Sequence, residues 1–138
     1  MSKYTAVSRK KPSLPMQFLE KNGLLVGDVL DYGCGRGFDV EYYKIDGYDP
    51  NWFPVDITKK YDTITCNFVL NVVTEEVQDI IISKVKSLLK PYGKAYFTVR
   101  RDMRANYQGR GCMQRLVYLD MPIIHKNSGQ WVMYVMLS

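Results

Sequence analysis

The stretch VLDYGCGRGFDVEYY, residues 29–43, decides how the rest of the chain is interpreted. Three glycines, Gly33, Gly35 and Gly37, alternate with other residues between an apolar run and a run of helical composition. Glycine is needed where the backbone takes a positive φ or passes very close to other atoms. We therefore expect a tight loop between a buried strand and a helix, with some group lying against that loop.

Strand and helix patterns alternate on both sides of this loop. Apolar runs predict parallel strands within residues 28–33, 45–51, 61–73 and 94–100. A short helix is expected from residue 16 to near Asn22-Gly23, a natural C-cap pair, and another is expected to start within 36–43. A third helix is expected within 74–93, because Thr74 can cap it, Glu75 and Glu76 suit its first turn, and Lys90 with Pro91-Tyr92-Gly93 ends it. Its expected apolar face comprises Val77, Ile80, Ile81, Val85, Leu88 and Leu89.

Two later apolar runs, 112–120 and 130–137, predict an antiparallel pair around a loop at 121–129. The fold class is therefore α/β, with a mostly parallel sheet, helices on its faces and a C-terminal antiparallel hairpin. The 138 residues suit one domain, 1–138, in which residues 1–20 form a basic arm and a short helix.

Composition narrows the kinds of function. No apolar run is long enough to span a membrane, and three widely spaced cysteines with one histidine do not form a typical metal site. The net charge is +4 over residues 1–19, −7 over 20–79 and +8 over 80–138. Basic terminal parts favour an anionic partner such as nucleic acid, a nucleotide or a phosphorylated metabolite, although ordinary surface charge is an equal reading.

The glycine loop follows one motif and departs from another. Phe38 occupies the third glycine position of G-x-G-x-x-G, whereas D-x-G-x-G-x-G fits Asp31 and the three glycines. Asp49 ends the next strand, 18 residues after Asp31, where an acid accepts hydrogen bonds from ribose hydroxyls.

These features resemble the class I S-adenosylmethionine-dependent methyltransferases, which have a Rossmann-like fold. YDTITCNFVLNVV (61–73) resembles the family's fourth-strand segment, and SLLKPYGKAYFTV (87–99) resembles its LLKPGG helix end and fifth strand. The segments KPSLP, DYGCGRGFDV, GYDP and FVLNVV further resemble short phage-encoded methyltransferases and those associated with DNA phosphorothioation clusters.

The resemblance implies S-adenosylmethionine as cofactor and assigns residues to it. Asp31 and the glycine loop would pass under the methionine part, and Asp49 would hold the ribose. Trp52 and Phe53 are candidates for stacking on the adenine, or else core residues, and Asp56 for bonding its amine. Asn67 would contact the methionine end or orient a substrate donor, which also makes it a catalytic candidate.

The chain departs from this family at two places. Only twelve residues separate Asp49 from Asp62, where the family fits a helix, a strand and another helix. The sheet should therefore be shortened between the family's second and fourth strands, and the open edge allows a homodimer. Asn67 is followed by Phe68 rather than by Pro-Pro, which weakens the case for methylation of DNA base amines.

The acceptor side is expected from the basic segments. The substrate-binding candidates are Arg9, Lys11, Arg100, Arg101, Arg104, Tyr107 and Arg110, since arginine forks clamp phosphate or carboxylate and tyrosine stacks on bases. Asp102 is a candidate general base, with an ion pair to a neighbouring arginine as the favoured alternative.

Three functions remain open at this point. The leading one is methyl transfer to an anionic acceptor such as DNA, RNA or a nucleotide, in the cytoplasm of a bacterium or a phage-infected cell. The second is enzymatic breakdown of S-adenosylmethionine without an acceptor. The third is a non-catalytic module that binds S-adenosylmethionine or nucleic acid and regulates a partner.

Overall fold

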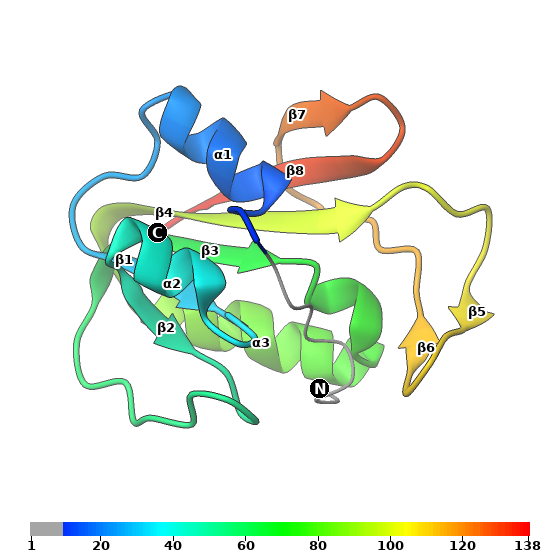
Figure 1. Ribbon diagram of the computed structural model, residues 1–138, viewed down its shortest axis with the longest axis horizontal. Coiled ribbons are helices and arrows are strands. Elements are labelled where there is room, and N and C mark those ends of the chain that lie inside the picture. The colour runs from blue at the N-terminus through cyan, green and yellow to red at the C-terminus, as the bar shows by residue number, and fades with distance from the viewer. Residues whose placement is uncertain (1–9) are drawn as a thin grey trace.

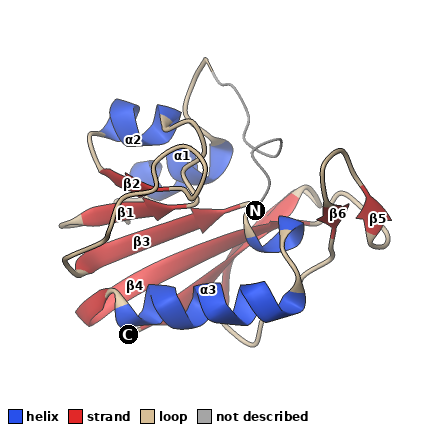
Figure 2. Ribbon diagram, turned by 90° about the horizontal axis from the view of Figure 1, so that it is seen from below, coloured by secondary structure: helices blue, strands red, loops and turns tan. Residues whose placement is uncertain are grey.

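A computed structural model of the chain describes residues 10–138. A six-stranded sheet in the order β2-β1-β3-β4-β8-β7 carries helices α1 and α2 on one face and α3 on the other (Figures 1 and 2). The parallel sheet with a C-terminal antiparallel part confirms the predicted fold class. The elements are α1 (Leu14–Lys21), β1 (Val29–Tyr32), α2 (Phe38–Tyr43), β2 (Asp46–Tyr48), β3 (Tyr61–Asn67), the 3₁₀ turn η2 (Leu70–Val72), α3 (Glu75–Ser87), β4 (Leu89–Arg100), β5 (Tyr107–Gln108), β6 (Met113–Gln114), β7 (Ile123–Asn127) and β8 (Trp131–Leu137).

The topology creates a switch point beside β1. Strand β1 pairs in parallel with β2 on one side and with β3 on the other, so the chain leaves β2 and crosses back over β1. Ligands of open parallel sheets bind where successive connections diverge in this way, at the carboxyl ends of the strands. Here that end is marked by Gly33 after β1 and by Asn67 at the end of β3.

Each face of the sheet has its own apolar cluster. Residues such as Leu30, Ile64 and Phe97 pack against α3 on one face. On the other face, Tyr96 and Met133 pack against Met16 and Leu19 of α1. The alternation along each strand therefore assigns every strand residue to the α1 side or the α3 side.

Helix α3 begins as expected and buries a different stripe. The Thr74 hydroxyl accepts the backbone N–H of Val77 across 3.3 Å. The expected apolar face was wrong at Val77 and Ile80, which are 37% and 66% exposed, and at Leu89, which begins β4; the buried helical positions are Gln78, Ile81 and Val85. These three lie at helical spacing on one face, and Ile80 is rotated about 100° from Ile81 out of that contact.

The shortened sheet edge was predicted correctly. Residues 50–60 form no strand beyond the single Asp49–Phe53 bridge, and β2 is the outermost strand on its side. The chain crosses from β2 to β3 by an irregular loop instead of a strand flanked by helices.

The C-terminal hairpin exists, but its first strand was placed wrongly. Residues 123–127, expected as loop, form β7 and pair with β8, whereas residues 112–120 contribute only the two-residue β6. Ser128 and Gly129 both have positive φ, 44° and 75°, so Asn-Ser-Gly makes the tight hairpin turn itself. His125 therefore lies in a strand, stacked on Phe18 with ring centroids 4.1 Å apart.

Candidate functional site at the carboxyl end of the sheet

The glycine loop curls directly after β1. All three glycines have positive φ: 86° at Gly33, 57° at Gly35 and 84° at Gly37. The backbone N–H groups of Gly33 and Cys34 both donate to the carbonyl oxygen of Tyr48, across 2.7 and 3.0 Å. The loop is thereby fastened to the end of β2.

Two apolar side chains lie against the loop, which accounts for two of the glycines. A Cβ at Gly33 would overlap Val69, which follows β3. A Cβ at Gly37 would lie 2.7 Å from the ring of Phe53, which follows β2. The loop can therefore meet the segments after both neighbouring strands only because it carries no side chains at these positions.

Asp49 connects the loop with the turn after β2. It is 6% exposed, and its Oδ2 accepts the N–H of Gly35 across 3.0 Å. Its Oδ1 accepts the N–H groups of Asn51 and Trp52 across 2.9 and 3.2 Å. A carboxylate offers about four acceptor positions, so roughly one remains for a ligand hydroxyl.

Asp31 links β1 to the neighbouring strand β3. It is buried on β1, and its Oδ1 accepts the hydroxyl of Thr65 on β3 across 2.8 Å. This bond joins β1 to β3, the two strands at the switch point. Asp31 therefore fixes the end of β1 from which the glycine loop begins.

Cys34 is held as a protonated thiol within the loop. Burial, and then the nearby carboxylates of Asp31 and Asp49, raise the pKa of this thiol to about 12. Such a thiol is a poor nucleophile near neutral pH, because the thiolate is the reactive form.

Asn67 stands at the end of β3 with an amide that lacks a partner. Both its Oδ1 and its Nδ2 are buried and accept or donate no hydrogen bond within residues 10–138. Buried amides are nearly always paired, since an unpaired one costs free energy. The next residue, Phe68, has φ 59°, a left-handed conformation that side chains disfavour. Unpaired atoms and backbone strain together make Asn67 a candidate ligand contact.

A family model described as a methyltransferase domain matches residues 6–127. The chain belongs to this family. It is a methyltransferase domain. Its glycine loop and Asn67 lie at the carboxyl end of the parallel strands, and Asp49 directly follows β2.

Solved methyltransferase structures share the fold. The 1,6-didemethyltoxoflavin-N1-methyltransferase of Burkholderia thailandensis, with 1,6-didemethyltoxoflavin and S-adenosylhomocysteine bound, is 14% identical with a TM-score of 0.64, over 88% of this chain and 75% of that one. An S-adenosylmethionine-dependent methyltransferase from Clostridium acetobutylicum is 12% identical with a TM-score of 0.55, over 88% and 87%. A search of curated proteins gives no significant match.

A third similar structure is larger than this methyltransferase. It is a protein described in connection with conversion of a disulfide bond into a thioacetal group during echinomycin biosynthesis. It is 20% identical with a TM-score of 0.56, and the match covers 63% of this chain. The chain spans only 48% of that protein's length.

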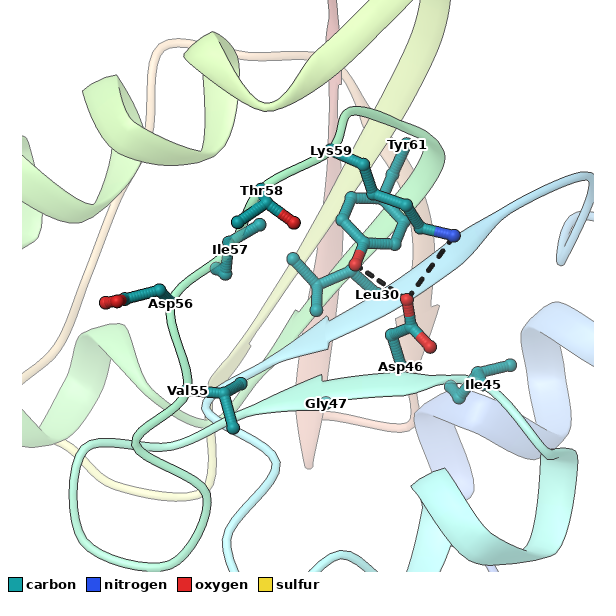
Figure 3. Close-up of a pocket in the computed structure, with 10 residues that line it drawn as sticks. All are labelled: Leu30, Ile45, Asp46, Gly47, Val55, Asp56, Ile57, Thr58, Lys59 and Tyr61. Carbon is teal, nitrogen blue, oxygen red and sulfur yellow. Dashed lines mark hydrogen bonds and ion pairs between the residues drawn. The ribbon is translucent and has the colours of Figure 1, made fainter.

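The three candidates for contacting the adenine, Trp52, Phe53 and Asp56, have different surroundings in the structure. The ring of Trp52 is 39% exposed, and the guanidinium of Arg36 lies over it, 4.8 Å from the centroid. The Phe53 ring packs against Gly37, as described above. Asp56 lies on the exposed loop between β2 and β3 and points away from the other residues of a cavity of about 350 Å³ (Figure 3). That cavity is lined by loop residues 55–59, by the first residues of β2 and β3, and by Leu30 and Ile45, not by the glycine loop.

Asp102 forms an ion pair, as the favoured alternative predicted. The Arg100 guanidinium donates to both of its carboxylate oxygens, across 2.8 and 3.2 Å. These bonds hold the pKa of Asp102 below its usual value, so it is a weak proton acceptor. Arg100 also donates to the Tyr107 hydroxyl across 2.7 Å, which makes a surface cluster of the three residues.

The remaining acceptor-side candidates differ in whether their side chains have partners within the protein. Arg101 donates to the hydroxyl of Tyr134 and lies 4.2 Å from the ring centroid of Tyr118. Arg104, Arg110 and Lys11 are exposed and form no hydrogen bond or ion pair within the described part of the chain. Arg9 lies outside the described residues.

Two structural connections were not anticipated. Buried Ser13 donates its N–H and its hydroxyl to the carboxylate of Asp39 on α2, across 3.0 and 2.8 Å, which fixes the segment after the basic arm. Arg115 donates to the carbonyl oxygens of Leu70 and Val73 and to the Gln78 side chain. A serine in a proline-rich segment was the available signal for the first; the second had none, because its partners lie at least 37 residues away.

No helix within residues 10–138 combines the length and apolar composition that crossing a membrane demands.

Proposed function

We propose that this methyltransferase transfers the methyl group of S-adenosylmethionine to an anionic acceptor, a nucleic acid or a nucleotide. The observation that carries the proposal is the buried, unpaired amide of Asn67, between the glycine loop and the basic residues after β4. When bound, S-adenosylmethionine supplies a methyl group already activated by a positively charged sulfur.

The residues present fit this cofactor. Asp49 keeps acceptor capacity for a ribose hydroxyl, and the Asn67 amide both donates and accepts. Trp52 presents an exposed aromatic face for the adenine. Asp56 is retained as a proposed contact of the adenine amine, and its substitution tests that contact.

The chain's own contribution to the reaction is alignment and exclusion of water. Transfer between aligned groups gains from proximity and needs no dedicated catalytic triad. The Asn67 amide can accept a hydrogen bond from the attacking group and orient its lone pair. Asp102, held by Arg100, supports the acceptor loop as an anion, and the proton of the acceptor then passes to solvent.

The anionic acceptor is supported by unpaired basic groups near this end of the sheet. Arg104 and Arg110 lie in the loop after β4, and Tyr107 between them is 42% exposed, with the Arg100 guanidinium 5.6 Å from its ring centroid. Lys11 lies apart from this loop, beside Tyr42 and Tyr43 at the end of α2, and is retained only as a proposed contact of an extended acceptor. Arginine with an exposed aromatic ring is the combination used for single-stranded nucleic acid.

Binding of labelled single-stranded DNA and RNA oligonucleotides, measured by fluorescence anisotropy against salt concentration, tests the acceptor class. We expect the salt slope to fall by about 0.7 for each phosphate contact removed in Arg104→Gln/Arg110→Gln. The matched control, Lys84→Gln/Lys86→Gln, removes two charges from α3 on the other face of the sheet. Equal losses in both variants, or affinity independent of salt, would contradict phosphate recognition by this loop.

Transfer of a radioactive methyl group into the same oligonucleotides separates the enzymatic alternatives. Labelled nucleic acid supports the proposal, whereas consumption of S-adenosylmethionine without a labelled acceptor indicates its breakdown. Binding without either reaction indicates a regulatory module. A DNA acceptor would agree with the closer resemblance to phage-encoded and phosphorothioation-associated methyltransferases, and a cytoplasmic location and a homodimer through the β2 edge belong to the same proposal.

A further inference from the structure

Three side chains with unpaired buried polar atoms are neighbours on the α1 side of the sheet. Asn67 on β3 is opposite Thr98 on β4 in the parallel register. Trp131 on β8 is opposite Arg100, two residues along β4 from Thr98, so it lies diagonally across from Thr98. Residues opposite one another or two apart on a strand point to the same face. Asn67, Thr98 and Trp131 therefore form one row across three strands.

None of the polar atoms in this row has a partner within residues 10–138. They are the Asn67 Oδ1 and Nδ2, the Thr98 Oγ1 and the Trp131 Nε1. Thr98 is 0% exposed and Trp131 is 5% exposed. By contrast, Thr65, on the same face of β3, donates its hydroxyl to Asp31. Unpaired atoms concentrated at one place, beside paired ones, point to a ligand that completes them.

The donors and acceptors of these three side chains determine which hydrogen-bonding groups such a ligand must present. The indole Nε1–H of Trp131 only donates, so it needs an acceptor atom. The Asn67 amide and the Thr98 hydroxyl each donate and accept, so they match an edge with alternating donor and acceptor atoms. The Trp131 ring packs against His125, with centroids 5.2 Å apart, which fixes the direction of its N–H.

We propose that Thr98 and Trp131, together with Asn67, bind the hydrogen-bonding edge of a nucleobase in the methyl acceptor. Thr98 and Trp131 contact the base directly and hold the ring while the basic loop contacts the phosphate. A planar heterocycle is the chemical class that offers several donors and acceptors on one rigid edge. This inference rests on the proposed function and narrows its acceptor from an anion to a nucleotide held by its base.

The test uses the full chain loaded with S-adenosylhomocysteine and the 5′-monophosphates of adenosine, cytidine, guanosine and uridine as probes. The chain has two tryptophans, so the ¹⁵N–¹H spectrum shows two indole signals, and Trp52→Phe assigns the signal of Trp131. At least one monophosphate should shift the Trp131 signal. Thr98→Val, which keeps the shape and removes the hydroxyl, should weaken binding of that nucleotide at least fivefold.

Stability and cofactor affinity are measured in the same variants. Removing an unpaired buried hydroxyl leaves the melting temperature of Thr98→Val equal to or above that of the wild type. Its affinity for S-adenosylhomocysteine should be unchanged. Thr58→Val, on the exposed loop before β3, is the matched control and should change neither nucleotide binding nor stability.

The outcomes separate this inference from the proposed function. Absence of S-adenosylhomocysteine binding by calorimetry contradicts the proposed function and this inference with it. Normal S-adenosylhomocysteine binding with a Trp131 signal that no monophosphate shifts overturns this inference alone. The same conclusion follows if Thr98→Val binds the nucleotide as the wild type does, because the row would then bind only structural water.

Discussion

The carboxylate of Asp49 accepts the backbone N–H of Gly35 across 3.0 Å, so the acid after β2 and the glycine loop after β1 form one unit. The other carboxylate oxygen of Asp49 organises the turn that brings Phe53 against Gly37. The cofactor end of the site is therefore built by mutual support of two loops. Several consequences of this arrangement can be measured.

Gly37→Ala should lose more stability and cofactor affinity than Gly23→Ala. Both positions have positive φ, 84° and 68°, so both substitutions carry a conformational cost of about 1–2 kcal/mol. At Gly23 a Cβ meets nothing within 4 Å, whereas at Gly37 it meets the Phe53 ring at 2.7 Å. Thermal unfolding with calorimetric titration of S-adenosylhomocysteine measures both effects. Equal losses in the two variants would show that the Phe53 contact is irrelevant.

Asp102→Asn should leave methyl transfer within a few-fold of the wild type. Its ion pair with Arg100 is partly exposed and is worth at most about 1 kcal/mol. Because the pKa of Asp102 is lowered, this contribution is present above the unfolded value near 3.9 and is lost as the pH falls through the folded value. A general base would instead contribute about 10²–10⁴ to the rate, with a change in the pH profile, and such a loss would contradict the ion-pair role.

Arg115→Met should destabilise the fold, and Arg110→Met should not. Arg115 donates to two backbone carbonyl oxygens of the segment after β3 and to the buried Gln78, and bonds of charged groups contribute about 1.5–3 kcal/mol. Arg110 is exposed and forms no such bonds among the described residues. Urea unfolding of both variants measures the difference. A stable Arg115→Met with weakened oligonucleotide binding would move Arg115 into the acceptor site.

Alkylation of Cys34 should be slow in the folded protein near pH 8. With its pKa raised from 9.0 to about 12, its thiolate fraction is about a thousandfold lower than that of an ordinary thiol. The same shift stabilises the fold fully below the unfolded pKa near 9, and this contribution is lost as the pH rises towards 12. Reaction with iodoacetamide, followed by peptide mass spectrometry, measures the rate. A native rate equal to that in urea would contradict the buried, protonated thiol.

Local patterns predicted the framework around the glycine loop well. The strand before Gly33, the acid at Asp49 and the missing sheet edge follow from short stretches whose spacing is set by neighbouring residues. Such signals survive because a loop between adjacent parallel strands is constrained mainly by its own sequence.

Features that depend on distant pairing were not predictable in this way. The row of Asn67, Thr98 and Trp131 depends on the register between three strands, which the sequence does not state. The place of β7 was missed because Asn-Ser-Gly at 127–129 was interpreted as the end of a loop rather than as a hairpin turn. Ile80 was placed on the wrong face because the buried polar Gln78, paired with Arg115, takes an apolar position.

The most direct test of the central claim is calorimetric titration of the full chain with S-adenosylhomocysteine, together with Asp49→Ala and Asp56→Ala. We predict that the wild type binds S-adenosylhomocysteine and that Asp49→Ala loses at least tenfold in affinity. Asp56→Ala should also bind more weakly than the wild type, because Asp56 is the proposed contact of the adenine amine. Folded wild-type protein that does not bind S-adenosylhomocysteine would contradict the assignment of the glycine loop, Asp49 and Asn67 to the cofactor.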